Sequence, residues 1–299
     1  MNPQSRYANK RAHRSKEAGK SPLTGCGRRA RGRLRAAFRS AKRAPGPTLV
    51  AYVTAGDPNL RFTEELVLRV ADAGVDVVEL GVPFSDPTAD GPVIQQASER
   101  ALRAGTTLTD VLKLARRIRR KSLIPLVLFS YLNPVLQLGL ERFAWRAAAA
   151  GIDGVLITDL TAEEAPGFIK VLRQVGLDTV FLAAPTSTRE RLRRIAGLSR
   201  GFVYVISRRG TTGAQQDVPT EVKGVVKRLR RYTNLPIAVG FGIAHHEQVA
   251  SLNGVADAVV VGSALVECCE RHGHGPEALA AAAQFLRELK GTASLQDKS

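Results

Sequence analysis

Three carboxylates that could take part in catalysis lie close together in the stretch VVELGVPFSDPTADGP at residues 77–92. Glu79 ends a run of apolar β-forming residues, so we expect it at the C-terminal end of a strand. Asp86 and Asp90 follow among Gly and Pro residues, which predict a turn-rich loop. Two acids in unlike surroundings can divide proton transfer and fixed charge between them. By itself the stretch is equally consistent with two turn-forming aspartates and a glutamate in a buried ion pair.

The elements that must position these acids follow a repeating pattern. Short runs rich in Val, Ile and Leu predict eight strands, at residues 49–53, 75–80, 124–129, 154–157, 179–182, 202–206, 236–239 and 258–261. Helical patterns occur at 33–42, 61–73, 93–103, 108–120, 140–150, 163–175, 189–198, 221–231, 246–252 and 277–289. Strands that are apolar without alternation are typical of parallel sheets. Eight such units in about 250 residues favour an α/β fold closed as a single (β/α)8 TIM barrel over an open doubly wound sheet.

Glycines follow the last three predicted strands, at Gly213, Gly242 and Gly262. Glycine lets backbone N–H groups approach an oxyanion closely, and a helix that starts after Ser263 adds positive potential. In TIM barrels the loops after strands seven and eight are a frequent phosphate site. We therefore predict a phosphate site at the same end of the barrel as Glu79. Tyr204, within strand six, and Tyr131 and Asn133, after strand three, fall near this end as well.

Composition excludes several classes of protein. With 44% hydrophobic residues the 299-residue chain can form a large core, and no apolar run approaches the roughly 20 residues of a membrane span. Cys26, Cys268 and Cys269 are too few for a disulfide framework, so we interpret them as free thiols in a reducing compartment. We expect a soluble cytoplasmic protein. A metal site at the adjacent His245, His246 and Glu247 is not favoured, because neighbouring side chains at a helix start point apart.

The net charge of +17 is concentrated at the N-terminus. Residues 1–43 hold 14 Lys and Arg and one acid, a net +13, which leaves +4 for the remainder. Residues 1–30 have no apolar periodicity, so we predict a disordered basic extension, and a second flexible tail at 291–299. The extension is open to three interpretations: an organellar transit peptide, an arm for nucleic acid or a membrane surface, or a non-functional extension from an early start site. We favour the last, because no aromatic platform for stacking bases is present there.

The motif ELGVPFSDPTADGP at 79–92 resembles the signature of the tryptophan synthase alpha subunit family. The resemblance continues through YVTAGDP (52–58), FSYLNPV (129–135), YVISRRGTTGA (204–214), VGFGI (239–243) and VVGSALVE (260–267), in the family's order. It covers about residues 31–290, which we expect to be one catalytic domain, and it leaves out the basic extension. Thr88, Thr161 and Phe202 depart from the usual pattern, but none of them removes a catalytic group.

The resemblance implies a carbon–carbon lyase that cleaves indole-3-glycerol phosphate to indole and glyceraldehyde 3-phosphate without a cofactor. It also implies a beta subunit that consumes the indole, in an α2β2 heterotetramer. Carried over, Glu79 is the acid–base carboxylate, Asp90 binds the indole N–H, and Tyr204 is the active-site tyrosine. The substrate-binding residues implied are Tyr52, Phe129, Tyr131, Thr212, Gly213, Phe241, Gly242, Gly262 and Ser263. The loops that should face the beta subunit carry Asp86, Pro87 and Asn133.

Three rival functions stay open on the sequence. An isomerase on the same phosphate-binding barrel is disfavoured by the motif at 79–92. A catalytically idle barrel that only activates a beta subunit is disfavoured by the presence of Glu79, Asp90 and Tyr204 together. Nucleic-acid binding through residues 1–43 is at most a secondary property, because the rest of the chain carries only +4.

Overall fold

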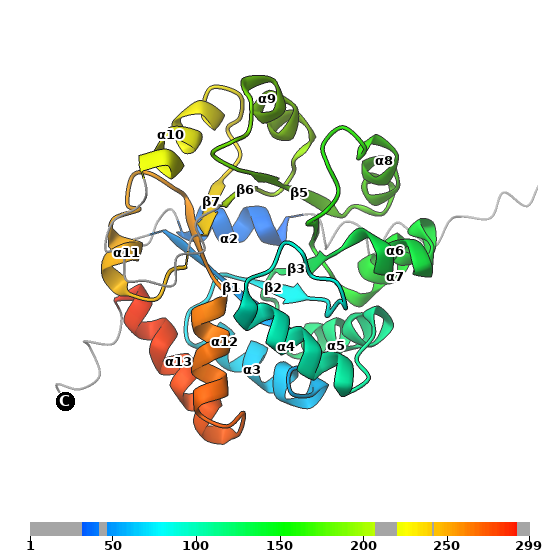
Figure 1. Cartoon of the computed structure of the whole chain (residues 1–299), viewed down its shortest axis with the longest axis vertical. Coiled ribbons are helices and arrows are strands. Elements are labelled where there is room, and N and C mark those ends of the chain that lie inside the picture. Colours follow the sequence, from blue (N-terminus) through cyan, green and yellow to red (C-terminus); the bar gives the residue numbers. More distant parts are fainter. Residues whose placement is uncertain (1–31, 42–46, 207–219, 241, 292–299) are drawn as a thin grey trace, which may run out of the picture.

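The structure is a computed structural model that describes residues 32–41, 47–206, 220–240 and 242–291. Its eight parallel strands close into one barrel in chain order, and the helices surround it (Figure 1), which confirms the predicted TIM barrel. The strands are β1 Thr48–Thr54, β2 Val77–Gly81, β3 Leu126–Ser130, β4 Gly154–Ile157, β5 Asp178–Ala183, β6 Val203–Ile206, β7 Ile237–Gly240 and β8 Ala258–Val261. The segments for which the sequence predicts disorder, 1–30 and 291–299, lie outside the described residues except for Gly291.

The helices of the described residues mostly match the predicted ones. They are α2 Arg33–Ala41, α3 Leu60–Asp72, α4 Pro92–Arg103, α5 Leu108–Lys121, α6 Leu132–Leu138, α7 Leu140–Ala150, α8 Pro166–Val175, α9 Arg189–Leu198, α10 Thr220–Leu229, α11 His246–Ala250, α12 Ser263–Arg271 and α13 Pro276–Lys290. None of these helices is long and apolar enough to cross a membrane.

One helix, α6, differs from the sequence prediction. We expected Asn133 on a loop, but it lies in the first turn of α6. The pair Asn133-Pro134 resembles a turn signal, yet proline is also well suited to the first turn of a helix, where its missing N–H has no partner to lose. Val135 anchors this helix, since it is fully buried in the outer core.

Side chains alternate along each strand between two separate cores. One set faces the surrounding helices and includes Ala51, Val78 and Leu128. The other faces the barrel interior, with Val50 and Val77 in its lower layer. Because the side-chain period of a strand is two, the residues that come two positions later face the same interior. Glu79 is two residues after Val77, and this is why its carboxyl group enters the barrel rather than the helix layer.

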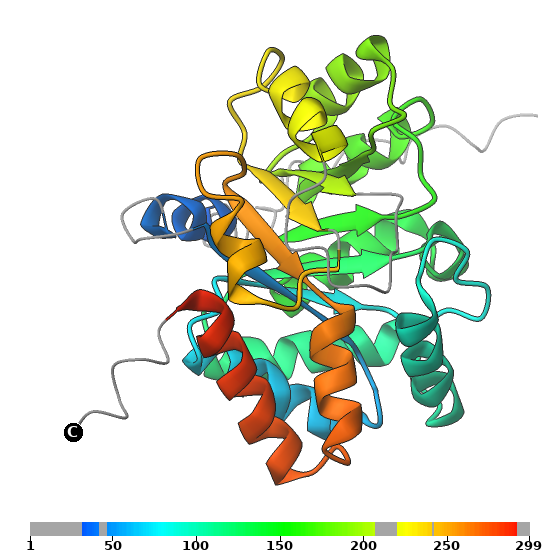
Figure 2. The same cartoon turned by 60° about the vertical axis from the view of Figure 1, so that its left-hand side comes forward.

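Helix α2 closes the end of the barrel where the strands begin. Its stripe residues Leu34 and Phe38 are only 1% and 2% exposed and pack on the lower interior layer. The ring of Phe38 lies 5.5 Å from that of Phe202, which is fully buried and carries no hydroxyl group that would need a partner there. Figure 2 shows α2, in blue, at the opposite end from the strand arrowheads. Within the described residues, α2 therefore covers the interior at the N-terminal strand ends, opposite the ends at which TIM-barrel active sites form.

A buried carboxylate fixes α2 to the barrel wall. Asp153, 3% exposed, accepts from Arg33 of α2 at 2.7 Å and from Arg119 of α5 at 3.0 Å. The backbone N–H of Leu126 donates to the same carboxylate at 2.9 Å. Removing one partner of such a buried pair typically costs about 3–5 kcal/mol, because the other charge stays buried. Arg33 and Arg119 therefore have a structural task at this end of the barrel.

Candidate active site

Glu79 lies at the centre of the upper barrel interior. It pairs in register with Tyr52 of β1 and Val127 of β3, and its side chain is fully buried. Neither carboxyl oxygen has a hydrogen-bond partner among the described residues. Burial without compensation disfavours the charged form and raises the pKa of Glu79 to about 8. At neutral pH the group is mainly protonated, and a pKa close to neutrality is what proton donation and later proton removal require.

Aromatic side chains form the walls around this carboxyl group. Tyr52 and Phe129 meet edge to face, with ring centroids 5.1 Å apart. Tyr204 lies on β6, two residues after Phe202, and so faces the interior in the layer of Glu79. Burial raises the pKa of the Tyr204 hydroxyl, and the nearby Glu79 raises it further. Burial also raises the pKa of the Tyr52 hydroxyl. Tyr52 and Tyr204 therefore both stay neutral in this site and can act only as hydrogen-bonding hydroxyls.

Two glycines make room for these tyrosine rings. A Cβ atom at Gly81 would overlap the hydroxyl end of Tyr52, and one at Gly240 would lie 2.5 Å from the Tyr204 hydroxyl oxygen. Any side chain at either position would displace a ring from the pocket. From the sequence, Gly81 counted only among the Gly and Pro residues that predict a turn-rich loop. A glycine at the last position of a barrel strand was the signal that could have shown this role.

Asp90 lies on the loop between β2 and α4 and is held by Tyr131. The Tyr131 hydroxyl donates to Asp90 Oδ2 at 3.2 Å and accepts from the backbone N–H of Ala89 at 2.9 Å. Phe84 stacks on the Tyr131 ring, with centroids 4.8 Å apart. Burial raises the pKa of Asp90 to about 6, and the Tyr131 hydrogen bond acts in the opposite direction. Asp90 is thus mainly ionised at neutral pH, whereas Glu79 is mainly protonated.

Gln95 also supports this loop, a role that no motif in the sequence indicated. From the first turns of α4 its side-chain amide donates to the backbone carbonyl of Asp90 at 2.9 Å and to that of Pro87 at 3.4 Å. Asp86, also on this loop, is exposed and accepts from the hydroxyl of Ser85 at 2.5 Å. An amide side chain on a helix is too common a feature to show such a contact from sequence.

The predicted phosphate residues converge at the neighbouring strand ends. Gly242 follows β7 with a φ of +78°, a conformation that favours glycine, and nothing lies within 4 Å of where its Cβ would be. Gly262 precedes α12 and lies beside Tyr52, and Ser263 is the first residue of that helix. The backbone N–H groups in the first turn of α12 can bind an anion. Thr212, Gly213 and Phe241 lie outside the described residues.

The residues predicted to face a partner lie on the same end of the barrel. Asp86 and Asn133 are exposed and Pro87 is half-buried. Leu136 of α6 is 57% exposed, and of the described leucines only Leu123 is more exposed. These residues come from two neighbouring units of the barrel, the loop that carries Asp90 and the helix that follows Tyr131.

An ionic network links the two helices that begin at the site. Arg100 of α4 donates to both carboxyl oxygens of Asp57, at 2.7 and 2.9 Å, and to Glu270 of α12 at 2.9 Å. Asp57 is on the loop after β1 and is only 7% exposed. The network ties α4, which follows Asp90, to α12, which begins at Ser263. The loop that carries Asp90 and the predicted phosphate site are therefore held in position relative to each other.

The comparisons with known proteins agree with this arrangement. The family model described as "Tryptophan synthase alpha chain" matches residues 38–294. The chain belongs to the tryptophan synthase alpha chain family. The alpha chain of Solibacter usitatus is 51% identical over 253 residues, which are 85% of this chain and 95% of that one. The alpha chain of Geobacter sulfurreducens is 49% identical over 239 residues, 80% of this chain and 90% of that one.

Solved structures show the same relationship to the tryptophan synthase alpha chain family. A chain of the Pyrococcus furiosus tryptophan synthase α2β2 complex superposes with a TM-score of 0.78 at 40% identity, covering 82% of this chain and 99% of that chain. The tryptophan synthase subunit alpha of Legionella pneumophila gives a TM-score of 0.79 at 35% identity, covering 87% and 98%. The family match begins at residue 38, so most of the basic N-terminal segment lies outside it.

Proposed function

We propose that this chain cleaves indole-3-glycerol phosphate to indole and glyceraldehyde 3-phosphate, as the alpha subunit of a tryptophan synthase. The observation that carries the proposal is the Glu79 carboxyl group, which is fully buried at a strand end and lacks a hydrogen-bond partner among the described residues. Such a group costs stability, and proteins keep strained or unsatisfied groups chiefly where function needs them.

The proposed reaction uses Glu79 first as an acid and then as a base. Protonated Glu79 gives its proton to C3 of the indole ring, which places positive charge on the ring nitrogen. The ionised carboxylate of Asp90 stabilises that charge. The bond between C3 and the glycerol chain then breaks, while Glu79 takes the proton of the 3′-hydroxyl group. Indole and an aldehyde are formed and Glu79 returns to its protonated form, so no cofactor is needed.

The remaining site residues bind the substrate in this scheme. Tyr52 and Phe129 hold the indole ring, and the Tyr204 hydroxyl is within reach of the glycerol chain beside Glu79. The phosphate group occupies the cradle of Gly242, Gly262 and Ser263. On the sequence resemblance, Thr212, Gly213 and Phe241 complete the pocket, and Tyr131 keeps Asp90 in position.

We also propose a beta subunit as the partner, bound over Asp86, Pro87 and Asn133. The Pyrococcus furiosus relative was solved as part of a tryptophan synthase α2β2 complex, to explain the mutual activation of that complex. Binding next to the loop that carries Asp90 would fix that carboxylate, and a misplacement of about 1 Å can cost on the order of a hundredfold in rate. We place the reaction in the cytoplasm, where the buried free thiols of Cys268 and Cys269 stay reduced.

The decisive experiment is an assay of indole release from indole-3-glycerol phosphate by the purified chain, titrated with its beta subunit. We expect slow turnover by the chain alone and an increase of about tenfold or more on saturation, equivalent to about 1.4 kcal/mol of barrier. Absence of indole release under both conditions would refute the lyase and leave an idle barrel. High turnover that does not respond to the beta subunit would refute the partner claim alone.

A further inference from the structure

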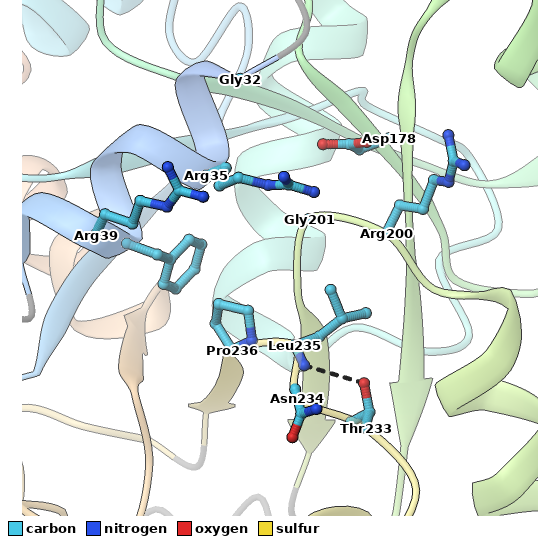
Figure 3. A pocket seen from close by; sticks show the side chains of 11 residues that line it. Gly32, Arg35, Arg39, Asp178, Arg200, Gly201, Thr233, Asn234, Leu235 and Pro236 are labelled. Carbon is cyan, nitrogen blue, oxygen red and sulfur yellow. Dashed lines mark hydrogen bonds between the residues drawn. The ribbon is translucent and has the colours of Figure 1, made fainter.

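A cavity of about 670 Å³ lies at the opposite end of the barrel from Glu79. It is bounded by α2, by the start of β5 and by the segments that lead into β6 and β7 (Figure 3). TIM-barrel active sites form at the other end, so the lyase chemistry gives these residues no task. The cavity is large enough for a small metabolite.

Three arginines line this cavity: Arg35 and Arg39 of α2, and Arg200 before β6. Within the described part of the chain, none of their guanidinium groups forms an ion pair or a side-chain hydrogen bond. Arg33 and Arg119 at the same end of the barrel are different, because both donate to the buried Asp153. The structural ion pairs of this end are thus already complete without the three cavity arginines.

Among the described residues that line the cavity, Asp178 is the one acid. Burial raises the pKa of its carboxyl group, and the charges of Arg200 and Arg35 oppose that effect, which places both guanidinium groups in its electrostatic neighbourhood. Figure 3 shows Arg35 extended between Asp178 and Gly201, with Arg39 and Arg200 on either side. Three guanidinium groups thus face a single carboxyl group among the described residues of this lining, so positive charge predominates there.

The opposite wall of the cavity is apolar. Leu235 and Pro236 contribute it, while Phe38 lines the cavity from α2, and the side chain of Thr233 accepts from the backbone N–H of Leu235 at 3.1 Å. A ligand for this cavity would therefore combine an anionic group with a body that can rest on an apolar surface. Guanidinium groups bind phosphate oxygens in pairs, and a phosphate monoester carries close to two negative charges at neutral pH.

We propose that this cavity is a second anion site, which binds a phosphate group, free or as the monoester of a small molecule, through Arg35, Arg39 and Arg200. The carboxyl group of Asp178 opposes the anion. The site is independent of the lyase reaction, since the closed lower layer of the barrel separates it from Glu79.

The test is calorimetric titration of the full-length chain with inorganic phosphate and with adenosine 5′-monophosphate at about 0.15 M salt, where long-range attraction is screened. The double variant Arg35→Gln/Arg200→Gln removes two cavity charges, and Arg142→Gln removes one exposed arginine on α7 as a matched control. The candidate active site and the basic extension 1–30 are the same in all three proteins, so a difference reports the cavity. We expect one binding event to weaken at least about tenfold in the double variant only.

The two probes distinguish the sources of the phosphate. Tighter binding of the nucleotide than of free phosphate indicates a monoester whose body uses the apolar wall, and equal binding indicates free phosphate. Binding by the double variant that equals wild type, with an unchanged melting temperature as the check of folding, would overturn the proposal.

Asp178→Asn gives a second test with the opposite sign. Removing the negative charge should tighten phosphate binding several-fold, a result that a general loosening of the structure would not produce. Weaker binding in Asp178→Asn would also overturn the proposal, because the carboxylate would then be attracting part of the ligand rather than repelling an anion.

Discussion

Substitution of Glu79 by Gln should abolish turnover and at the same time stabilise the fold. Gln keeps the size of the side chain but can neither give nor take a proton at neutral pH. Loss of general acid–base catalysis costs up to about 10⁴-fold, and because one group serves both steps here we expect a loss of at least about 10³-fold in kcat, equivalent to about 4 kcal/mol. The measurement is steady-state release of indole.

The stability gain follows from the raised pKa of Glu79. The pKa is about 8 in the folded chain and about 4.5 for a glutamate side chain free in water. Between these two values the folded protein holds a proton that the unfolded chain has lost, so the wild type loses free energy of unfolding as pH rises, by about 1.4 kcal/mol per pH unit. This contribution is fully present below pH 4.5 and is lost as pH rises towards 8. At pH 7 the accumulated loss is on the order of 3 kcal/mol, and Gln does not incur it.

Urea unfolding of both proteins between pH 5.5 and pH 7.5, about the range over which only the unfolded form of Glu79 is ionised, measures this difference directly. The advantage of Glu79→Gln should grow with pH by about 1.4 kcal/mol per unit. Glu267→Gln, the same change at an exposed position of α12, is the matched control and should change stability by less than about 0.5 kcal/mol at every pH. A pH-independent difference would refute the buried protonated carboxyl, and near-normal turnover of Glu79→Gln would refute its catalytic role.

Four further predictions concern the active-site pocket and the basic extension. The pH profile of kcat/KM should be bell-shaped, with an acid limb near 6 as Asp90 loses its charge and a basic limb near 8 as Glu79 loses its proton; a flat profile between 5 and 9 would contradict both assignments. Tyr131→Phe should lower kcat/KM by about tenfold to a hundredfold and move the acid limb to higher pH, because the hydrogen bond that favours ionised Asp90 is lost; an unmoved limb would show that the bond does not act on Asp90. Gly81→Ala should displace Tyr52, reduce turnover and cost about 1–3 kcal/mol of stability by urea unfolding, whereas Gly167→Ala in α8, with open space around the new methyl group, should not destabilise the fold; equal behaviour of the two would exclude the steric explanation. A chain that starts at residue 31 keeps the Arg33–Asp153 ion pair and should retain its melting temperature and lyase activity, and a large drop in either would show that the basic extension packs on the barrel.

The barrel itself could be predicted from the sequence, because its signal is local. Runs of Val, Ile and Leu of strand length, separated by helical periodicity, identified all eight strands within a few residues. Helix α6 was missed since Asn133-Pro134 fits a turn and a first helical turn equally well, and only the burial of Val135 selects the helix. Local patterns cannot decide between two conformations that tertiary packing separates.

The sequence by itself determined which residues could do the chemistry and at which end of the barrel they lie. Glu79 follows Val77 at a strand end, and the family resemblance named Asp90, from the same motif, and Tyr204, from the motif at 204–214, as its companions. Only the tertiary structure decided their chemical states. The pKa of Glu79 rises because a closed barrel removes water from every side of it, and Tyr131 reaches Asp90 across 41 positions of the chain. Contacts between distant segments also explain why a side chain at position 81 would overlap the Tyr52 ring. They form the cavity beside Arg35 as well. Desolvation and long-range contacts exist only after distant segments have packed together, and no local pattern encodes them.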